Sequence, residues 1–199
     1  MRSHIDDLLS RIAQLEREVE HELNRARARW HYRVEAGRIR FERDIYLAHK
    51  RLKLSIPRFL RESRPVNWLT APVIYAMIVP IAIVDLSFSF YQSVCFPIYG
   101  IARVRRSVYI VIDRHHLAYL NVVEKFNCIY CGYANGVIAY AREIAGRTEQ
   151  YWCPIRHARL VRGPHAHYHA FVHYGDANGY QQRLPVLRNE LRPKRTVDR

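Results

Sequence analysis

The sequence lacks the short motifs by which the common enzyme classes are recognised. It has no G-x-G-x-x-G or G-x-x-x-x-G-K-[ST] phosphate-binding loop, no H-E-x-x-H, no G-x-S-x-G nucleophile elbow and no C-x-x-C-H haem attachment site. It is also poor in lysine, which occurs only at positions 50, 53, 125 and 194, so arginine supplies nearly all of the positive charge. The sequence therefore indicates no reaction, and it favours a non-enzymatic protein over an enzyme.

A secretory signal is also missing. Residues 1–60 are charged throughout and contain no apolar core followed by a small-residue cleavage site. There are no internal repeats and no long low-complexity segment. We therefore expect the apolar run inside the chain to be retained in the mature protein.

That apolar run, from Trp68 to Ile101, is the feature around which the chain is organised. Its one charged residue is Asp85, in a chain of which 25% is charged. An apolar run of about 18 or more residues is typical of a membrane segment, because about 20 helical residues cross a hydrocarbon layer roughly 30 Å thick. The sequence therefore predicts a membrane-embedded helical segment within residues 65–102.

Two geometries fit this segment. One is a single tilted span from about Trp68 to Tyr91. The other is a re-entrant or in-plane hairpin with arms at residues 69–84 and 86–101, turning near Pro80 or Asp85. The residues alone leave both open.

The positive charge gathers on both sides of the apolar run. The formal net charge is +14 and the pI about 10.0. The flanking arginines are Arg58, Arg61, Arg64, Arg103, Arg105 and Arg106. Each basic residue near an anionic leaflet contributes about 1 kcal/mol of attraction, so this placement predicts membrane lipids rather than nucleic acid as the partner. By the positive-inside rule we expect both soluble parts to lie in the cytoplasm.

Residues 1–64 predict a long, basic, amphipathic helix. Ser3 can cap it, and apolar residues then recur every three or four positions from Ile5 to Trp30 and, with a drift, to Leu52. We expect one helix of roughly 50 residues that ends before Pro57. Since a polar helix of this length cannot bury itself, residues 3–56 are expected to bind a protein partner or a second copy, with a coiled coil over residues 3–30.

Residues 103–199 predict a small, α-rich domain. The expected elements are a strand at Val108–Ile112, helices over residues 115–126 (capped by Asp113) and 135–150, and a helix over residues 176–191 kinked at Pro185.

Three of the four cysteines fall in a metal-ligand pattern. Cys128-x2-Cys131 is followed by Cys153-x3-His157, and the helix over residues 135–150 would connect the two loops. Two short-spaced pairs can close a tetrahedral Cys3His shell, which predicts a structural Zn²⁺. An iron centre, either an iron–sulfur cluster or a rubredoxin-like single iron, is the competing interpretation, and ordinary buried thiols without metal are the third.

Histidine is the other enriched residue. The candidates are His165, His167, His169 and His173, and the adjacent pair His115 and His116. Alternate positions on a strand, or positions four apart on a helix, could bind metal. Surface histidines in a tyrosine-rich loop are the alternative, and no nucleophile lies near the adjacent pair to make it a general base.

The segments DRHHLAYLN, EKFNCIYCGYANG, AYAREIAGRTEQYWCPIRHA and HYGDA, within residues 82–176, resemble an uncharacterised family of small bacterial membrane proteins. The resemblance covers about half of the chain and implies a bacterial membrane protein, but no activity. The cysteine pattern also resembles that of zinc ribbons, from which Cys153 and His157 depart because they replace a second C-x2-C pair.

Together these features predict a mainly α protein in three parts: a helical arm (1–64), a membrane segment (65–102) and a metal-stabilised cytoplasmic domain (103–199). The expected function is that of an adaptor or scaffold, without catalysis, at the inner membrane of a bacterium. A membrane-associated redox protein with an iron centre is the alternative.

Overall fold

A computed structural model describes residues 43–193 without a gap, and before them residues 7, 11, 14–15, 17–22, 24–25, 32–35 and 38–41. The described chain is mainly helical, as predicted. It divides into two compact units. The first comprises Met1–Glu62 and Asp113–Phe126, and the second Ser63–Ile112 and Asn127–Arg199.

The first unit contains a β-hairpin and two short helices. These elements are β1 (Tyr32–Glu35), β2 (Arg38–Phe41), α2 (Arg43–Arg51) and α3 (Ile56–Glu62). The prediction of one continuous helix through residues 1–56 is therefore wrong. At the described positions between 7 and 25 the backbone is helical, and the predicted coiled coil falls in part on residues outside the described ones.

The hairpin has a local cause in the sequence. Apolar and charged residues alternate through both strands, and the antiparallel register pairs Glu35 with Arg38. Alternation with a period of two residues favours a strand over a helix. This local signal overrides the weaker helical spacing.

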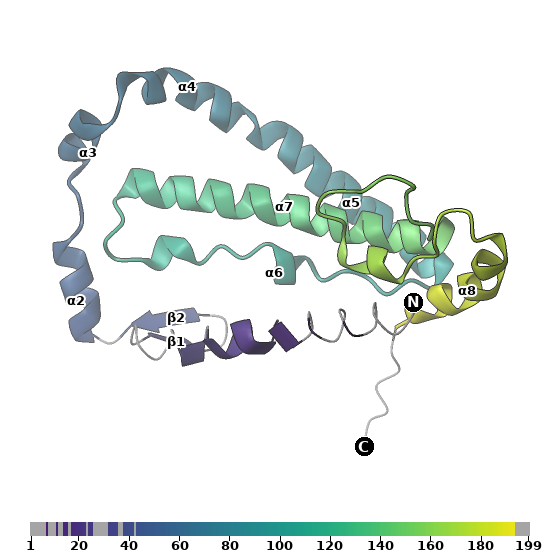
Figure 1. The fold of residues 1–199 in the computed structure, drawn as a ribbon. Coiled ribbons are helices and arrows are strands. Elements are labelled where there is room, and N and C mark those ends of the chain that lie inside the picture. Colours follow the sequence, from purple (N-terminus) through teal and green to yellow (C-terminus); the bar gives the residue numbers. More distant parts are fainter. Residues whose placement is uncertain are drawn as a thin grey trace. The chain divides into compact units, whose positions relative to one another are not determined.

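The second unit is built from α4 (Pro65–Ala76), α5 (Ile78–Tyr99), α6 (Arg106–Tyr109), the greater part of α7 (Val122–Trp152), η2 (Ala166–Ala170) and α8 (Ala177–Glu190). In Figure 1, α5 runs beside the C-terminal half of α7, and α8 lies at the end of this pair. The core of this unit includes a cluster of Phe96, Ile101, Val104, Tyr140, Ile144 and Leu191.

Helices α4 and α5 form one helical run of 35 residues, from Pro65 to Tyr99, whose most apolar 18-residue stretch has a mean hydropathy of 2.1. It is the one helix in the described part of the chain that is long and apolar enough to cross a membrane. The predicted alternative of a hairpin turning near Pro80 or Asp85 is wrong. Pro80 lies in the first turn of α5, where a missing N–H is tolerated, and the helix continues through Asp85.

The chain reverses direction where α5 ends. Gly100 adopts a left-handed conformation with φ +71°, and the N–H of Ile101 donates to the carbonyl of Phe96 at 2.8 Å. Glycine is the residue that takes this conformation without a Cβ penalty. The N–H of Ala102 then donates to the carbonyl of Leu191 at 2.8 Å, which fixes the end of α8 beside the turn.

Helix α7 begins earlier than predicted. The Oδ1 atom of Asn121 accepts from the N–H of Glu124 at 3.0 Å, and a carboxylate oxygen of Glu124 accepts from the N–H of Asn121 at 2.8 Å. This reciprocal capping box starts a helix of 31 residues, which contains the predicted helix 135–150 and ends where Pro154 prevents its continuation. The predicted helix over 115–126 is reduced to η1 (Arg114–His116) and the first turn of α7.

The predicted strand at Val108–Ile112 is also wrong. This stretch consists of the end of α6 and an irregular segment whose backbone lies directly on α7 at Gly136. A strand needs a neighbouring strand for its hydrogen bonds, and no such neighbour lies within the second unit as described. The C-terminal helix is confirmed as α8, capped by Asp176, whose Oδ1 accepts from the N–H of Gly179 at 2.8 Å.

Candidate functional site

The polarity of α5 is reversed relative to a helix of a water-soluble protein. Asp85, Ser89 and Gln92 recur at helical spacing on one face, and Asp85 and Gln92 are only 8% and 6% exposed. The large exposed side chains of α5 are all apolar: Val79, Ile83, Val84, Leu86, Phe90, Val94 and Ile98. A surface helix in water buries its apolar face and exposes its polar one. The opposite arrangement on α5 is typical of a helix whose outer surface contacts lipid.

The buried carboxylate of Asp85 is fully paired. Arg106 donates to it from Nε at 3.0 Å and from Nη2 at 2.5 Å, and the hydroxyl of Tyr133 on α7 donates to Oδ2 at 3.0 Å. The same carboxylate raises the pKa of the Arg106 guanidinium. Three segments of the second unit therefore meet at one carboxylate.

Gln92 continues this polar stripe two turns beyond Asp85 on α5. Its side-chain oxygen accepts from the N–H of Val104 at 2.9 Å, and its side-chain nitrogen donates to the carbonyl of Val104 at 3.3 Å and to the hydroxyl of Tyr140. The hydroxyl of Ser89 lies 3.2 Å from the same tyrosine oxygen. The segment after α5 is thus held on the polar stripe by side chains and backbone together.

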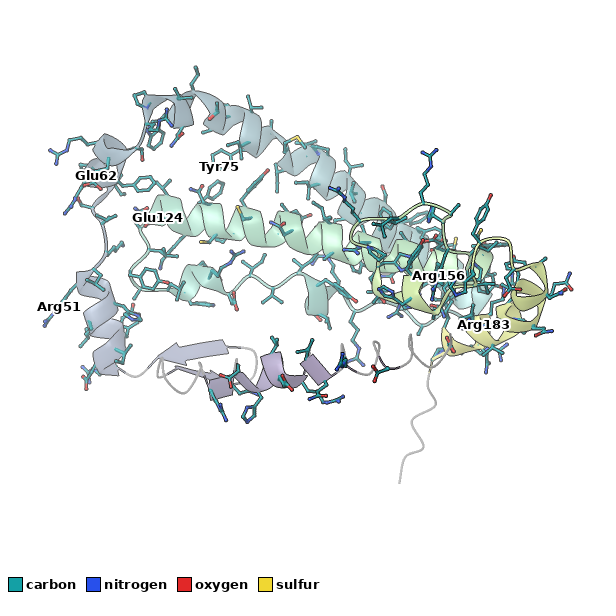
Figure 2. The ribbon with its side chains drawn as sticks, viewed as in Figure 1. Arg51, Glu62, Tyr75, Glu124, Arg156 and Arg183 are labelled. Atoms are coloured by element: carbon teal, nitrogen blue, oxygen red, sulfur yellow. The ribbon has the colours of Figure 1, made fainter. Side chains whose placement is uncertain are left out.

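Helix α7 also contacts α4. The hydroxyl of Tyr130 donates to the carbonyl of Ile74 at 2.7 Å, and the hydroxyl of Tyr75 donates to the side-chain oxygen of Asn127. The rings of Tyr75 and Tyr130 meet edge to face at 5.7 Å, and Figure 2 shows Tyr75 between the two helices. Tyrosines of α7 therefore contact polar groups on both α4 and α5.

A second polar cluster lies between α7 and the segment after it. Glu143 accepts from Arg147 at 2.8 Å and pairs with the ring nitrogen of His167 at 3.0 Å, and Glu149 pairs with the ring nitrogen of His165 at 2.8 Å. The hydrogen bonds from His167 and Arg147 lower the pKa of Glu143 to about 2, although burial opposes this. We call these five residues the acid–histidine cluster; it fastens residues 164–171 to α7.

The predicted metal ligands are not brought together. Cys128 and Cys131 lie one turn apart within α7, not in a loop, and Cys153 follows the end of that helix, about 30 Å further along at roughly 1.5 Å per residue. His157 is exposed, and its ring stacks on Tyr168. Among the described residues there is no group of three or more His, Cys, Asp or Glu side chains that could hold a metal ion. The described structure therefore does not fit a Cys3His shell.

The other predicted histidines have separate positions. His165 and His167 belong to the acid–histidine cluster, whereas His169 and His173 are exposed. His115 and His116 contact each other, with ring centroids 3.9 Å apart. The alternate spacing of residues 165 and 167 pointed to a shared face, but nothing local to the sequence indicated Glu143 and Glu149 as their partners.

Comparison with known proteins adds no assignment. No protein-family model, curated protein or solved structure matches the chain. Any inference about function therefore depends on the geometry described above.

Proposed function

We propose that this protein is a membrane-anchored adaptor without catalytic activity. Its α4–α5 run is embedded in the inner membrane of a bacterium, and its soluble parts lie in the cytoplasm. The observation that carries the proposal is the reversed polarity of α5, which has a buried polar stripe and an exposed apolar surface. Only 6% of the most apolar 18-residue stretch of α4–α5 is buried within the protein.

Helix α4 extends the same surface. Its most exposed large side chains are Val66, Leu69 and Val73, at 59%, 80% and 70% exposure, and it buries no residue of its own. Water-soluble monomers seldom expose a continuous apolar surface larger than a few hundred Å². Together, α4 and α5 present such a surface along 35 residues, so lipid is its natural solvent.

The arginines on either side of the run suit an anionic leaflet. Arg61, Arg64, Arg103 and Arg105 lie just outside the run and are exposed. A guanidinium binds phosphate oxygens bidentately, so these side chains are matched to lipid headgroups. Because both ends of the run carry such residues, we place both ends at the same leaflet.

The N-terminal arm supplies the adaptor's second contact. Leu15 and Val19 lie one helical turn apart and are each 59% exposed. Apolar residues at this spacing form the seam by which a helix binds another helix. We therefore assign this arm to a protein partner or to a second copy of the chain.

Structural zinc is not part of this proposal, and neither is the iron centre of the redox alternative. Both need the thiolates of Cys128, Cys131 and Cys153 around one ion, and α7 keeps the first two far from the third. In this proposal the acid–histidine cluster supplies the stabilisation that was expected from a metal, since it holds the C-terminal segment on α7.

Membrane embedding is tested by placing charge on the apolar surface. We expect the double substitution L69D/V73D to move the protein out of the carbonate-resistant membrane fraction, because each buried carboxylate costs about 2.5–3.5 kcal/mol at depth. The matched control is L160D. Leu160 is 94% exposed and lies outside α4–α5, so the L160D protein should stay in the membrane fraction like the parent. Equal membrane fractions for L69D/V73D and L160D would contradict the proposal.

A further inference from the structure

Helices α5 and α7 leave an open pocket between them, of about 570 Å³. Phe88 and Tyr91 line it from α5, and Ala145, Glu149 and Trp152 line it from α7. The volume lies within the range of roughly 300–1,000 Å³ that is usual for small-molecule sites. It is therefore large enough to hold a ligand of moderate size.

The pocket persists because the helices are held together beside it by polar contacts. The hydroxyl of Tyr91 lies 3.1 Å from the hydroxyl of Thr148, and both residues belong to its lining. Ala145 is a small residue at a position where a larger side chain would occupy the space. The walls are thus fixed by the fold, and the space between them is not closed by side chains.

The chemistry of the lining is apolar with one polar edge. Phe88, Tyr91, Ala145 and Trp152 supply carbon surface, whereas Glu149 supplies a carboxylate. One oxygen of this carboxylate is paired with His165, and a carboxylate has further lone pairs to offer a donor. The occupant should therefore have a hydrocarbon part and a hydrogen-bond donor at one end.

The pocket is continuous with the surface that the proposed function assigns to lipid. Leu86 and Phe90 are 73% and 71% exposed, and they flank Ser87 and Tyr91 of the lining on α5. A molecule entering from that surface comes from the bilayer itself. Resting on the proposed membrane location, we propose that the pocket holds an acyl chain of a membrane phospholipid whose ammonium headgroup donates to Glu149. A free fatty acid is a poorer match, because its carboxylate would be repelled by Glu149.

Tryptophan fluorescence in vesicles tests this inference and the proposed function separately. The chain has three tryptophans, so W30F/W68F leaves Trp152 in the pocket and W30F/W152F leaves Trp68 in α4. Phosphatidylethanolamine with brominated chains, added to a non-brominated bilayer, quenches a tryptophan that it contacts. We expect quenching of Trp68 to follow the bulk fraction of brominated lipid. Quenching of Trp152 should reach half its maximum at a fraction of brominated lipid that is about tenfold lower. This corresponds to a preference of the lipid for the pocket over the bulk bilayer of about 1.4 kcal/mol.

Filling the pocket should remove that preference. A145F places a ring in the space from α7, and S87L approaches it from α5, so one informative variant remains if the other fails to fold. The control A139F changes an exposed alanine of the same helix outside the lining. Brominated phosphatidylcholine, whose quaternary ammonium cannot donate a hydrogen bond, tests the headgroup and should lose most of the preference.

Each outcome has a distinct meaning. If Trp68 is quenched while Trp152 follows the bulk curve or is not quenched, the lipid pocket is wrong and the membrane location stands. If neither tryptophan is quenched, the proposed function fails as well. Equal preference for the two brominated lipids would overturn the contact with Glu149, and a preference that persists in A145F and S87L would overturn the pocket.

Discussion

Asp85 in the middle of α5 and Arg106 beyond its end form a two-point ion pair, with Nη2 of the arginine 2.5 Å from Oδ2 of the carboxylate. After the turn at Gly100 the chain runs back along α5, and this ion pair holds it there. A carboxylate in an apolar run is costly unless it has a partner, and here the fold supplies one from outside the run. Asp85 therefore has a structural role in directing residues 101–112.

The first prediction concerns this pair. D85N keeps the shape of the side chain but removes the charge, which leaves Arg106 without its ionic partner. We expect a loss of about 1–2 kcal/mol in the free energy of unfolding, because the arginine is half exposed and water compensates in part. Thermal unfolding in detergent micelles, followed by circular dichroism, measures it.

The matched control is D113N, because the side chain of Asp113 makes no capping hydrogen bond to η1. The double variant D85N/R106Q should lose less than the sum of the two single changes, since the partners are in contact. Strict additivity would show that the pair is not coupled.

The second prediction concerns pH. His167 and Arg147 hold the pKa of Glu143 at about 2, below its ordinary value of 4.5. A depressed carboxyl pKa means that this stabilisation is complete above pH 4.5 and is lost as the pH falls from there toward 2. Between pH 5 and 3 the free energy of unfolding of the parent should fall by about 1–3 kcal/mol more than that of E143Q. Parallel curves for the two proteins would exclude Glu143 as the source.

Much of the helical architecture follows from local signals in the sequence, and the errors have local causes as well. The apolar run and the C-terminal helix α8 were predicted correctly, because composition and helix-start signals act within a few residues. The Cys-x2-Cys pair suggested a loop, whereas the capping box at Asn121 and Glu124 had already started a helix there. The signal Asn-x-x-Glu was present and outweighs the cysteine spacing.

Other contacts could not have been read from the sequence. The pairs His165–Glu149 and His167–Glu143 join residues 16 and 24 positions apart. Their formation depends on how the chain turns after α7, and no local pattern encodes that turn. The same holds for Arg106, whose partner is 21 positions away.

The third prediction compares two glycines of α7. A Cβ at Gly136 would lie 2.8 Å from the backbone Cα of Ile110, whereas a Cβ at Gly146 would lie 2.8 Å from the ring nitrogen of His165. Both substitutions gain about 1 kcal/mol of helix propensity. A side chain can move more easily than a backbone, so G136A should be the more destabilising by about 1–2 kcal/mol.

Unfolding temperatures of the two variants, measured in the same detergent, decide the point. G146A should in addition weaken the pairing of His165 with Glu149. The C-terminal segment should then become more sensitive to protease while α4–α5 stays protected. The reverse order of stability would show that residues 109–110 do not rest on α7.

The fourth prediction concerns the cysteines. Since α7 separates Cys128 from Cys153, the double variant C128S/C153S should unfold within about 1 kcal/mol of the parent, as substitutions outside buried networks do. A structural zinc contributes on the order of 10 kcal/mol, so its loss would be unmistakable. Unfolding with and without a chelator, together with elemental analysis of the parent, makes the measurement. A large loss of stability and stoichiometric zinc in the parent would restore the metal-centred interpretation.

The last prediction concerns topology. A helix that crosses the bilayer would put Arg64 and Arg103 on opposite sides, yet both belong to arginine-rich flanks that favour the cytoplasmic leaflet. The irregular segment after α5 runs back along it, and irregular backbone is not tolerated against lipid. From both arguments we expect α4–α5 to lie along one leaflet, with its apolar surface in the hydrocarbon and its polar stripe covered by α7. In a background without other cysteines, the exposed Cys153 and a cysteine introduced by S55C should therefore react with a membrane-impermeant maleimide from the same side.

In intact cells neither cysteine should react with the maleimide, and after permeabilisation both should. Labelling of only one of them in intact cells would show that α4–α5 crosses the membrane, and the placement of both soluble parts in the cytoplasm would then be wrong.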